Sequence, residues 1–170
     1  MRSEYGRALR QIVERGLKAS PFGWQPVALK SDYVFPGERV FQRPGEAEGL
    51  LFWCVLVPHQ NLEQFTFDIG WSRLGRFPEL TMRPSLQRPL EAFGLPEYFG
   101  RLGEVSSGQD LWWEVEPFRA PRGLADLEKM VQPIPAETAR ARVTPVAERA
   151  LDVLERVGVP YLLEAEARGA

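Results

Sequence analysis

The fold is decided by residues 49–71, which read GLLFWCVLVPHQNLEQFTFDIGW. Residues 50–57 form an unbroken apolar run, which is typical of a strand that is covered on both faces. Residues 65–71 alternate between large apolar and small or polar side chains, as a strand with one buried face does. The polar residues 58–64 between the two runs predict a turn. The stretch therefore predicts an antiparallel hairpin.

Further strands are predicted on both sides of this hairpin. Proline and glycine residues upstream separate two short extended segments, which we expect at residues 31–35 and 39–43. Their close spacing to the hairpin favours an antiparallel meander. A long segment rich in proline and glycine follows, with a short helix expected at residues 85–93. Residues 111–116 then predict a last strand, which contains the adjacent pair Trp112 and Trp113.

The two ends of the chain are predicted to be helical. An apolar stripe with helical spacing covers residues 5–17, and a shorter one covers residues 124–131. The strongest stripe runs from Val143 to Val157, where Thr144 and Pro145 have the residue types of a helix start and Gly158 has that of a helix end. A continuous helix from Ala136 that is kinked at Pro145 is the alternative. A final short helix is expected at residues 161–168.

Strands and helices are thus segregated along the sequence instead of alternating. This order predicts an α+β fold, in which an antiparallel sheet of about four to five strands packs against N-terminal and C-terminal helices on one face. A chain of 170 residues fits one domain, so residues 1–170 are interpreted as a single α+β domain.

Composition excludes several classes of protein. The net charge of −2 lacks the concentrated basic surface that nucleic acids and anionic membranes require. The longest apolar run is much shorter than the ~20 residues that span a bilayer. One cysteine cannot form an internal disulfide, which favours the reducing cytoplasm as the location. The sequence makes no prediction of the oligomeric state.

The side chains with the most reactive chemistry do not form a recognisable catalytic set. Cys54 lies within the apolar strand, where a thiol stays protonated, and His59 lies in the predicted turn. Each is the only residue of its type, so a zinc site would need carboxylates for its other ligands. We therefore predict no metal site and no catalytic residue. No glycine-rich phosphate loop occurs, and no cofactor is predicted.

Three carboxylates are candidate binding or acid/base residues. Glu114 and Glu116 are two residues apart on the last predicted strand, which would place both on one face. Such a pair could supply a general acid and a general base. The favoured interpretation is an amphipathic strand whose two glutamates face water. Asp68 lies between Phe67 and Ile69, so we expect it on the solvent side of the sheet, or in a cleft if both faces are covered.

Two tryptophans complete the set of candidate binding residues. Trp71 ends the hairpin, and Trp112 must face the side of its strand opposite to Trp113. Either ring could belong to a binding surface, because aromatic and arginine side chains are enriched in protein interfaces. Packing within the core is the favoured interpretation, since large aromatic side chains are highly buried on average.

Several short segments resemble a family of small bacterial proteins that is described only as a domain of unknown function. The segments are the opening helix at residues 5–17, the region around Phe41, the strand at residues 65–70, the Trp112-Trp113 pair and the closing residues 158–164. The resemblance implies a small cytosolic α+β protein. It brings no established activity with it, although some small domains of this kind neutralise toxins.

These observations favour an uncharacterised, non-catalytic cytoplasmic protein that binds another protein. An immunity-type inhibitor is one form of this function. The first alternative is a carboxylate-based enzyme that uses Glu114 and Glu116. The second is a carrier of a small apolar ligand, with a pocket lined by Trp53, Trp71 or Trp113.

Overall fold

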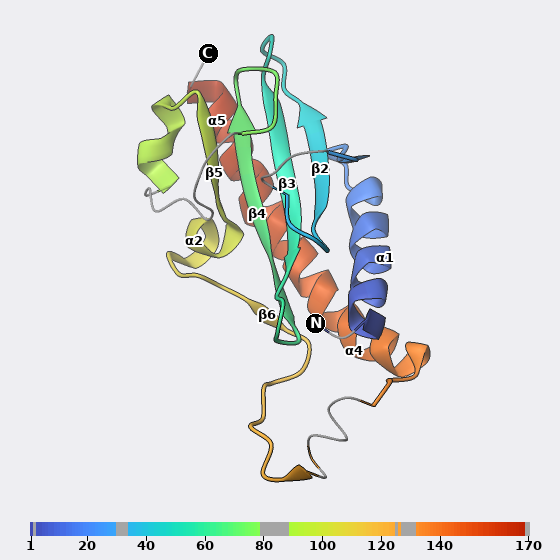
Figure 1. The fold of residues 1–170 in the computed structure, drawn as a ribbon. Coiled ribbons are helices and arrows are strands. Elements are labelled where there is room, and N and C mark those ends of the chain that lie inside the picture. Colours follow the sequence, from blue (N-terminus) through green and yellow to red (C-terminus); the bar gives the residue numbers. More distant parts are fainter. Residues whose placement is uncertain (2, 30–33, 79–88, 125, 127–131, 169–170) are drawn as a thin grey trace.

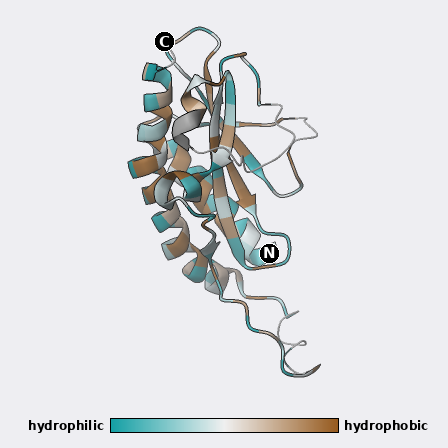
Figure 2. Ribbon diagram, turned by 90° about the vertical axis from the view of Figure 1, so that its left-hand side faces the viewer, coloured by the Kyte–Doolittle hydropathy of each residue, from teal (hydrophilic) through white to brown (hydrophobic). Residues whose placement is uncertain are grey.

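The sheet and the helices form two layers (Figure 1). The structure, a computed structural model, describes residues 1, 3–29, 34–78, 89–124, 126 and 132–168. Its long helices lie on one face of an antiparallel sheet, as the side view in Figure 2 also shows. This arrangement confirms the predicted α+β fold with N-terminal and C-terminal helices. No helix among these residues is long and apolar enough to span a membrane.

The sheet is slightly larger than the sequence predicts. Its strands are β1 (Gln25–Val27), β2 (Arg39–Pro44), β3 (Leu51–Pro58), β4 (Gln64–Ser72), β5 (Glu97–Arg101) and β6 (Trp113–Glu114). The first five are adjacent in chain order, and β6 pairs with β4. Since β5 pairs with residues 68–72 of β4 and β6 with residues 64–65, these two short strands share one edge of β4.

The predicted hairpin of β3 and β4 forms the centre of the sheet and is buried on both faces. Phe52, Cys54 and Leu56 of β3 pack into the main core beneath the helices. Trp53 and Val55 face the opposite side and pack in a second cluster with Val40, Phe77 and Phe99. The continuous apolar run in the sequence therefore reflects a strand with two covered faces, as predicted.

The helical layer consists of α1 (Ser3–Ala19) and a long C-terminal helix. The latter comprises α4 (Ala136–Val153), a π-helical turn η2 (Leu154–Gly158) and α5 (Val159–Arg168). The predicted helix start at Thr144 and the predicted end at Gly158 are therefore wrong. The alternative of a continuous helix from Ala136 is right, and its kink at Pro145 stays a prediction. Pro145 is exposed inside α4, and the Thr144 hydroxyl donates 2.8 Å to the Arg140 carbonyl one turn earlier.

Other predictions shift or fall outside the described residues. The strand expected at residues 111–116 is reduced to β6, and the short helix expected before it is a 3-10 turn, η1 (Pro89–Gly94), where it is described. The strand expected at residues 31–35 and the helix expected at 124–131 lie largely outside the described residues. The sequence interpretation missed β1, β5 and α2 (Leu102–Ser107).

Candidate functional site

Asp68 is buried instead of solvent-facing. It lies on the face of β4 opposite the helices and is directly across from Arg101 at the end of β5. The Arg101 Nε atom is 2.9 Å from Asp68 Oδ1, and both side chains are almost fully buried. The expectation of a solvent-side carboxylate is wrong because the sheet is covered on this face as well. Asp68 is thus tied to a guanidinium group within the fold.

Arg101 connects Asp68 to the surface. Its Nη1 atom donates 3.0 Å to the more exposed carboxylate of Asp110, and its guanidinium lies 4.6 Å from the ring centre of Trp112. The indole N–H of Trp112 donates to Asp110 at 3.3 Å, and the ring meets His59 edge-on at 5.1 Å between centres. Trp112 is therefore half-buried and held by its neighbours at the end of the sheet.

Trp71 lies in the core. Its ring is completely buried against Phe93, Tyr98 and Tyr161, and its N–H donates to the Leu95 carbonyl at 3.1 Å. This placement excludes Trp71 from an exposed binding surface. The sequence pattern could not distinguish packing in the core from exposure on a binding surface. The alternation of β4 is the same whether β5 covers this end of the strand or not.

Glu114 and Glu116 do not converge. Trp113 pairs with Phe65 and stacks on it beneath the helices, so the alternation of the strand directs Glu114 to the opposite face, where it is exposed. The chain then bends, because the N–H groups of Val115 and Glu116 both donate to the Glu63 carbonyl. Glu116 thereby turns toward the helices. The expectation that both glutamates share a face is wrong because the strand ends at Glu114.

Glu116 is held by two helical residues. Its Oε2 atom accepts a hydrogen bond from the Tyr5 hydroxyl at 2.8 Å and another from Arg142 at 3.2 Å. Arg142 also donates to the Tyr5 hydroxyl at 2.7 Å. Burial and the bond to Glu116 raise the pKa of Tyr5, and the bond to Tyr5 raises the pKa of Arg142. This triad joins α1, α4 and the segment after β6 at one point.

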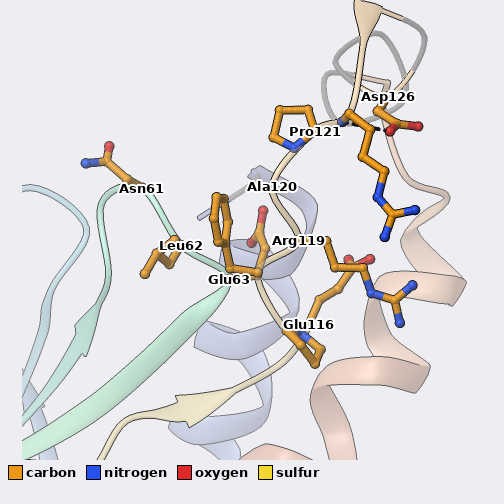
Figure 3. Close-up of a pocket in the computed structure, with 11 residues that line it drawn as sticks. Asn61, Leu62, Glu63, Glu116, Arg119, Ala120, Pro121 and Asp126 are labelled. Carbon is orange, nitrogen blue, oxygen red and sulfur yellow. Dashed lines mark hydrogen bonds between the residues drawn. The ribbon is translucent and has the colours of Figure 1, made fainter.

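The segment that follows this triad carries the two most exposed large apolar side chains among the residues that the structure describes. Residues 117–124, here called the arm, extend beyond the sheet and the helices in both ribbon views (Figures 1 and 2). Phe118 and Leu124 on the arm are 63% and 80% exposed. A groove of about 890 Å³ lies between the arm and the β3–β4 turn, which contributes Leu62 and Glu63 to its lining (Figure 3).

The sequence interpretation missed the arm. Phe118 stands in the sequence PFRAPRGL, in which two prolines and a glycine mark a loop but do not indicate its direction. The signal that could have found it is a large aromatic side chain within a segment that has no strand or helix pattern. Aromatic side chains carry a large apolar area and dominate the energetics of cores and interfaces, so one in an irregular segment is a candidate for an interface.

The only thiol and the only imidazole of the sequence lie in different surroundings, one in the core and the other in the β3–β4 turn. Cys54 is fully buried, and burial together with the negative charge of Asp68 raises the pKa of its thiol well above the ordinary value. The His59 Nδ1 atom accepts hydrogen bonds from the backbone N–H groups of Asn61 and Leu62 in the turn. Among the described residues, no group of three or more potential metal ligands comes together.

The rings considered for a ligand carrier contact other parts of the protein. Trp53 packs edge-on against Phe77, and Trp113 packs against Phe65 and Phe67. Trp71 is enclosed as described above. All three rings are buried, and each packs against other aromatic side chains of the protein.

Comparisons with known proteins give no relative for this chain. No protein-family model matches it, and no curated protein or solved structure is significantly similar to it. The resemblance to a bacterial domain of unknown function therefore stays a prediction.

Proposed function

We propose that this protein binds another protein and that the arm is inserted into the partner. The observation that carries the proposal is the exposure of Phe118 and Leu124 on a segment that extends away from the folded body. Single exposed apolar side chains are common on protein surfaces. Two large ones on one projecting segment are unusual, because they would be more stable against an apolar surface.

The backbone of the arm favours this role. Pro117 and Pro121 restrict the φ angles of the segment and reduce the conformational freedom that binding would remove. The base of the arm is held by the contacts of Glu116 with Tyr5 and Arg142. An arm that leaves the body in a fixed direction loses less entropy when a partner binds. Phe118 is followed by Arg119, and aromatic and arginine side chains are enriched in protein interfaces.

An immunity-type inhibitor is one concrete form of this function. Such a protein blocks an enzyme by occupying its surface and needs no catalytic residues of its own. The inert, buried thiol and the diverging glutamates are compatible with this role. Action in the cytoplasm is part of the proposal, because the chain's one cysteine is buried and unpaired.

The test uses three tagged proteins for affinity capture from a lysate of the source organism. Quantitative mass spectrometry then compares the proteins that each of them captures. The tagged proteins are the wild type, the arm variant Phe118→Ser/Leu124→Ser and the control Leu74→Ser. Leu74 is 53% exposed in a loop away from the arm. We expect the same partner to be enriched by the wild type and the control and to be lost with the arm variant. Equal capture by all three proteins would contradict the proposal.

A further inference from the structure

The His59 side chain holds the β3–β4 turn together. Its Nδ1 atom accepts hydrogen bonds from the backbone N–H groups of Asn61 at 3.1 Å and Leu62 at 3.0 Å. An imidazole nitrogen that accepts a hydrogen bond carries no hydrogen of its own. The turn in this conformation therefore requires His59 in its neutral form, with the ring hydrogen on Nε2.

A second proton on the ring removes this acceptor. The charged imidazole has hydrogens on both nitrogens and accepts no hydrogen bond. The new Nδ1–H group would point at two backbone N–H groups, which are donors as well, so both hydrogen bonds would be lost. Histidine is the side chain whose charge changes in mildly acidic solution, which makes the turn sensitive to pH.

Two of the charged groups around His59 are positive. The amino group of Met1 donates to the His59 carbonyl at 2.9 Å. The ring of Trp112, which meets His59 edge-on, lies 4.6 Å from the Arg101 guanidinium. The carboxylate of Asp110 also contacts Trp112, but it is paired with Arg101. A charged imidazole would be repelled by both cations, so protonation favours movement of the ring out of its place in the turn.

The turn in its turn fixes the base of the arm. The Glu63 carbonyl accepts hydrogen bonds from the N–H groups of Val115 at 2.7 Å and Glu116 at 3.4 Å, where the chain bends toward the arm. Side chains of the turn also line the groove beside the arm (Figure 3). A backbone hydrogen bond of 2.9 Å to the Gln64 carbonyl closes the hairpin without the imidazole. Protonation therefore affects residues 60–63 and leaves the strands paired.

We propose that His59 is a pH switch for the arm: its protonation releases residues 60–63, loosens the base of the arm and weakens binding of the partner. This inference rests on the function proposed above, because it concerns regulation of the same binding site. An arm held in a fixed direction loses less entropy on binding, and this advantage disappears when the turn is released. Binding is therefore tighter at neutral pH than in acid.

Nuclear magnetic resonance tests the switch in the free protein. His59 is the only histidine of the sequence, so its ring signals are unambiguous. At neutral pH we expect the ring hydrogen on Nε2, and on acidification we expect the Asn61, Leu62 and Val115 amide signals to change with the same midpoint as the ring. The protection factor of the Val115 amide in hydrogen exchange should fall roughly tenfold. A hydrogen on Nδ1 at neutral pH, or a Val115 amide that does not respond, would refute the switch.

Two variants separate loss of the acceptor from a general effect of acid. His59→Asn keeps an acceptor that does not titrate, because an asparagine side chain can bond to backbone N–H groups two residues further on. His59→Leu removes the acceptor at every pH. We expect the Val115 amide to stay protected in acid in His59→Asn and to be poorly protected at neutral pH in His59→Leu. The same response to acid in the wild type and in His59→Asn would overturn the proposal.

Affinity capture at about pH 7.5 and about pH 5.5 then links the switch to partner binding. The arm-dependent partner is the one lost with Phe118→Ser/Leu124→Ser. The wild type should lose this partner in acid, whereas His59→Asn should retain it, and equal capture by the wild type at both pH values would refute the switch. Failure to capture an arm-dependent partner at neutral pH would instead refute the proposed function, and the resonance measurements decide the coupling of His59 to the arm independently.

Discussion

Arg101 Nε lies 2.9 Å from Asp68 Oδ1, and the two residues are directly opposite each other on β5 and β4. This ion pair is buried under the loop that carries Asp110 and Trp112, both of which also contact the guanidinium. One arginine thus fixes the edge strand β5 to the hairpin and the loop to the sheet. Both side chains of the pair are almost fully buried, and the arginine contacts the protein on each side.

Removing one partner of this pair should strongly destabilise the protein. Arg101→Met leaves the Asp68 carboxylate buried without its cation, and loss of one partner of a buried pair typically costs about 3–5 kcal/mol. The control is Asp110→Asn, since Asp110 is 54% exposed and its ion pair should contribute below about 1 kcal/mol. Urea denaturation of the three proteins measures both effects. Similar losses for the two variants would mean that the Asp68–Arg101 pair is not effectively buried.

Gly70 is required by the close approach of β5 to β4. A Cβ atom at this position would lie 2.0 Å from the backbone oxygen of Tyr98 and 2.8 Å from Phe99 Cα. Backbone atoms cannot move aside as a flexible side chain can, so Gly70→Ala should cost at least the ~1–3 kcal/mol typical of overpacking. Gly123→Ala is the matched control, because no atom of the residues that the structure describes lies within 4 Å of its added carbon. Thermal melting of both variants tests this, and equal melting temperatures would contradict it.

The sequence was sufficient to predict the central hairpin. Residues 50–57 are apolar without interruption, and this pattern has one explanation in a short strand, namely burial on both faces. The antiparallel order followed from the short connections, which leave no room for a crossover helix. The helices of the two ends followed from their apolar stripes.

The site could not be predicted in the same way, because its geometry depends on partners far away in the sequence. Asp68 reads as a solvent-facing residue until Arg101 is placed beside it by β5, a strand whose residues Glu97–Arg101 carry no strong alternation. The divergence of Glu114 and Glu116 depends on the Glu63 carbonyl, which bends the chain after β6. The pattern of apolar and polar residues along one strand does not indicate the contact of Asp68 with Arg101 or the bend at the Glu63 carbonyl.

The helix start predicted at Thr144 and Pro145 was wrong because packing against distant residues outweighs the local preference of proline. This residue type favours a helix start, but burial of Val143, Val146 and Ala147 against the core continues the helix through it. Tertiary packing here outweighs a local penalty of about 3 kcal/mol for proline within a helix. The penalty is still present in the folded protein and can be measured.

Pro145→Ala should therefore stabilise the protein. The alanine N–H can bond to the Ala141 carbonyl, which Pro145 leaves without its usual donor, and no packing is lost because Pro145 is exposed. The greater freedom of the unfolded chain offsets part of the gain. We expect a net increase of about 1–2 kcal/mol in the free energy of unfolding, measured in urea. Arg149→Ala on the exposed side of α4 serves as the control, and a less stable Pro145→Ala protein would contradict the argument.

Cys54 should make the stability of the protein fall at alkaline pH. Burial raises the pKa of its thiol in the folded state, whereas the unfolded chain has the ordinary value of about 8.5. Below that pH the thiol is protonated in both states and stability is unaffected. Above it the unfolded chain releases the proton and the folded protein does not, so the free energy of unfolding decreases as pH rises. Urea denaturation across this range should give a flat and then a falling profile.

The variant Cys54→Ala separates this contribution from that of the tyrosines. Burial also raises the pKa of Tyr98 to about 12, so its contribution to the decline begins only above the ordinary tyrosine value of about 10. Cys54→Ala should therefore remove the decline between about pH 8.5 and 10 and leave the later one. In the wild type, a thiol-specific reagent at neutral pH should react only after urea is added, because the folded protein holds the thiol buried and protonated. Rapid labelling of the folded protein would show that Cys54 is accessible and that the sheet is not covered there.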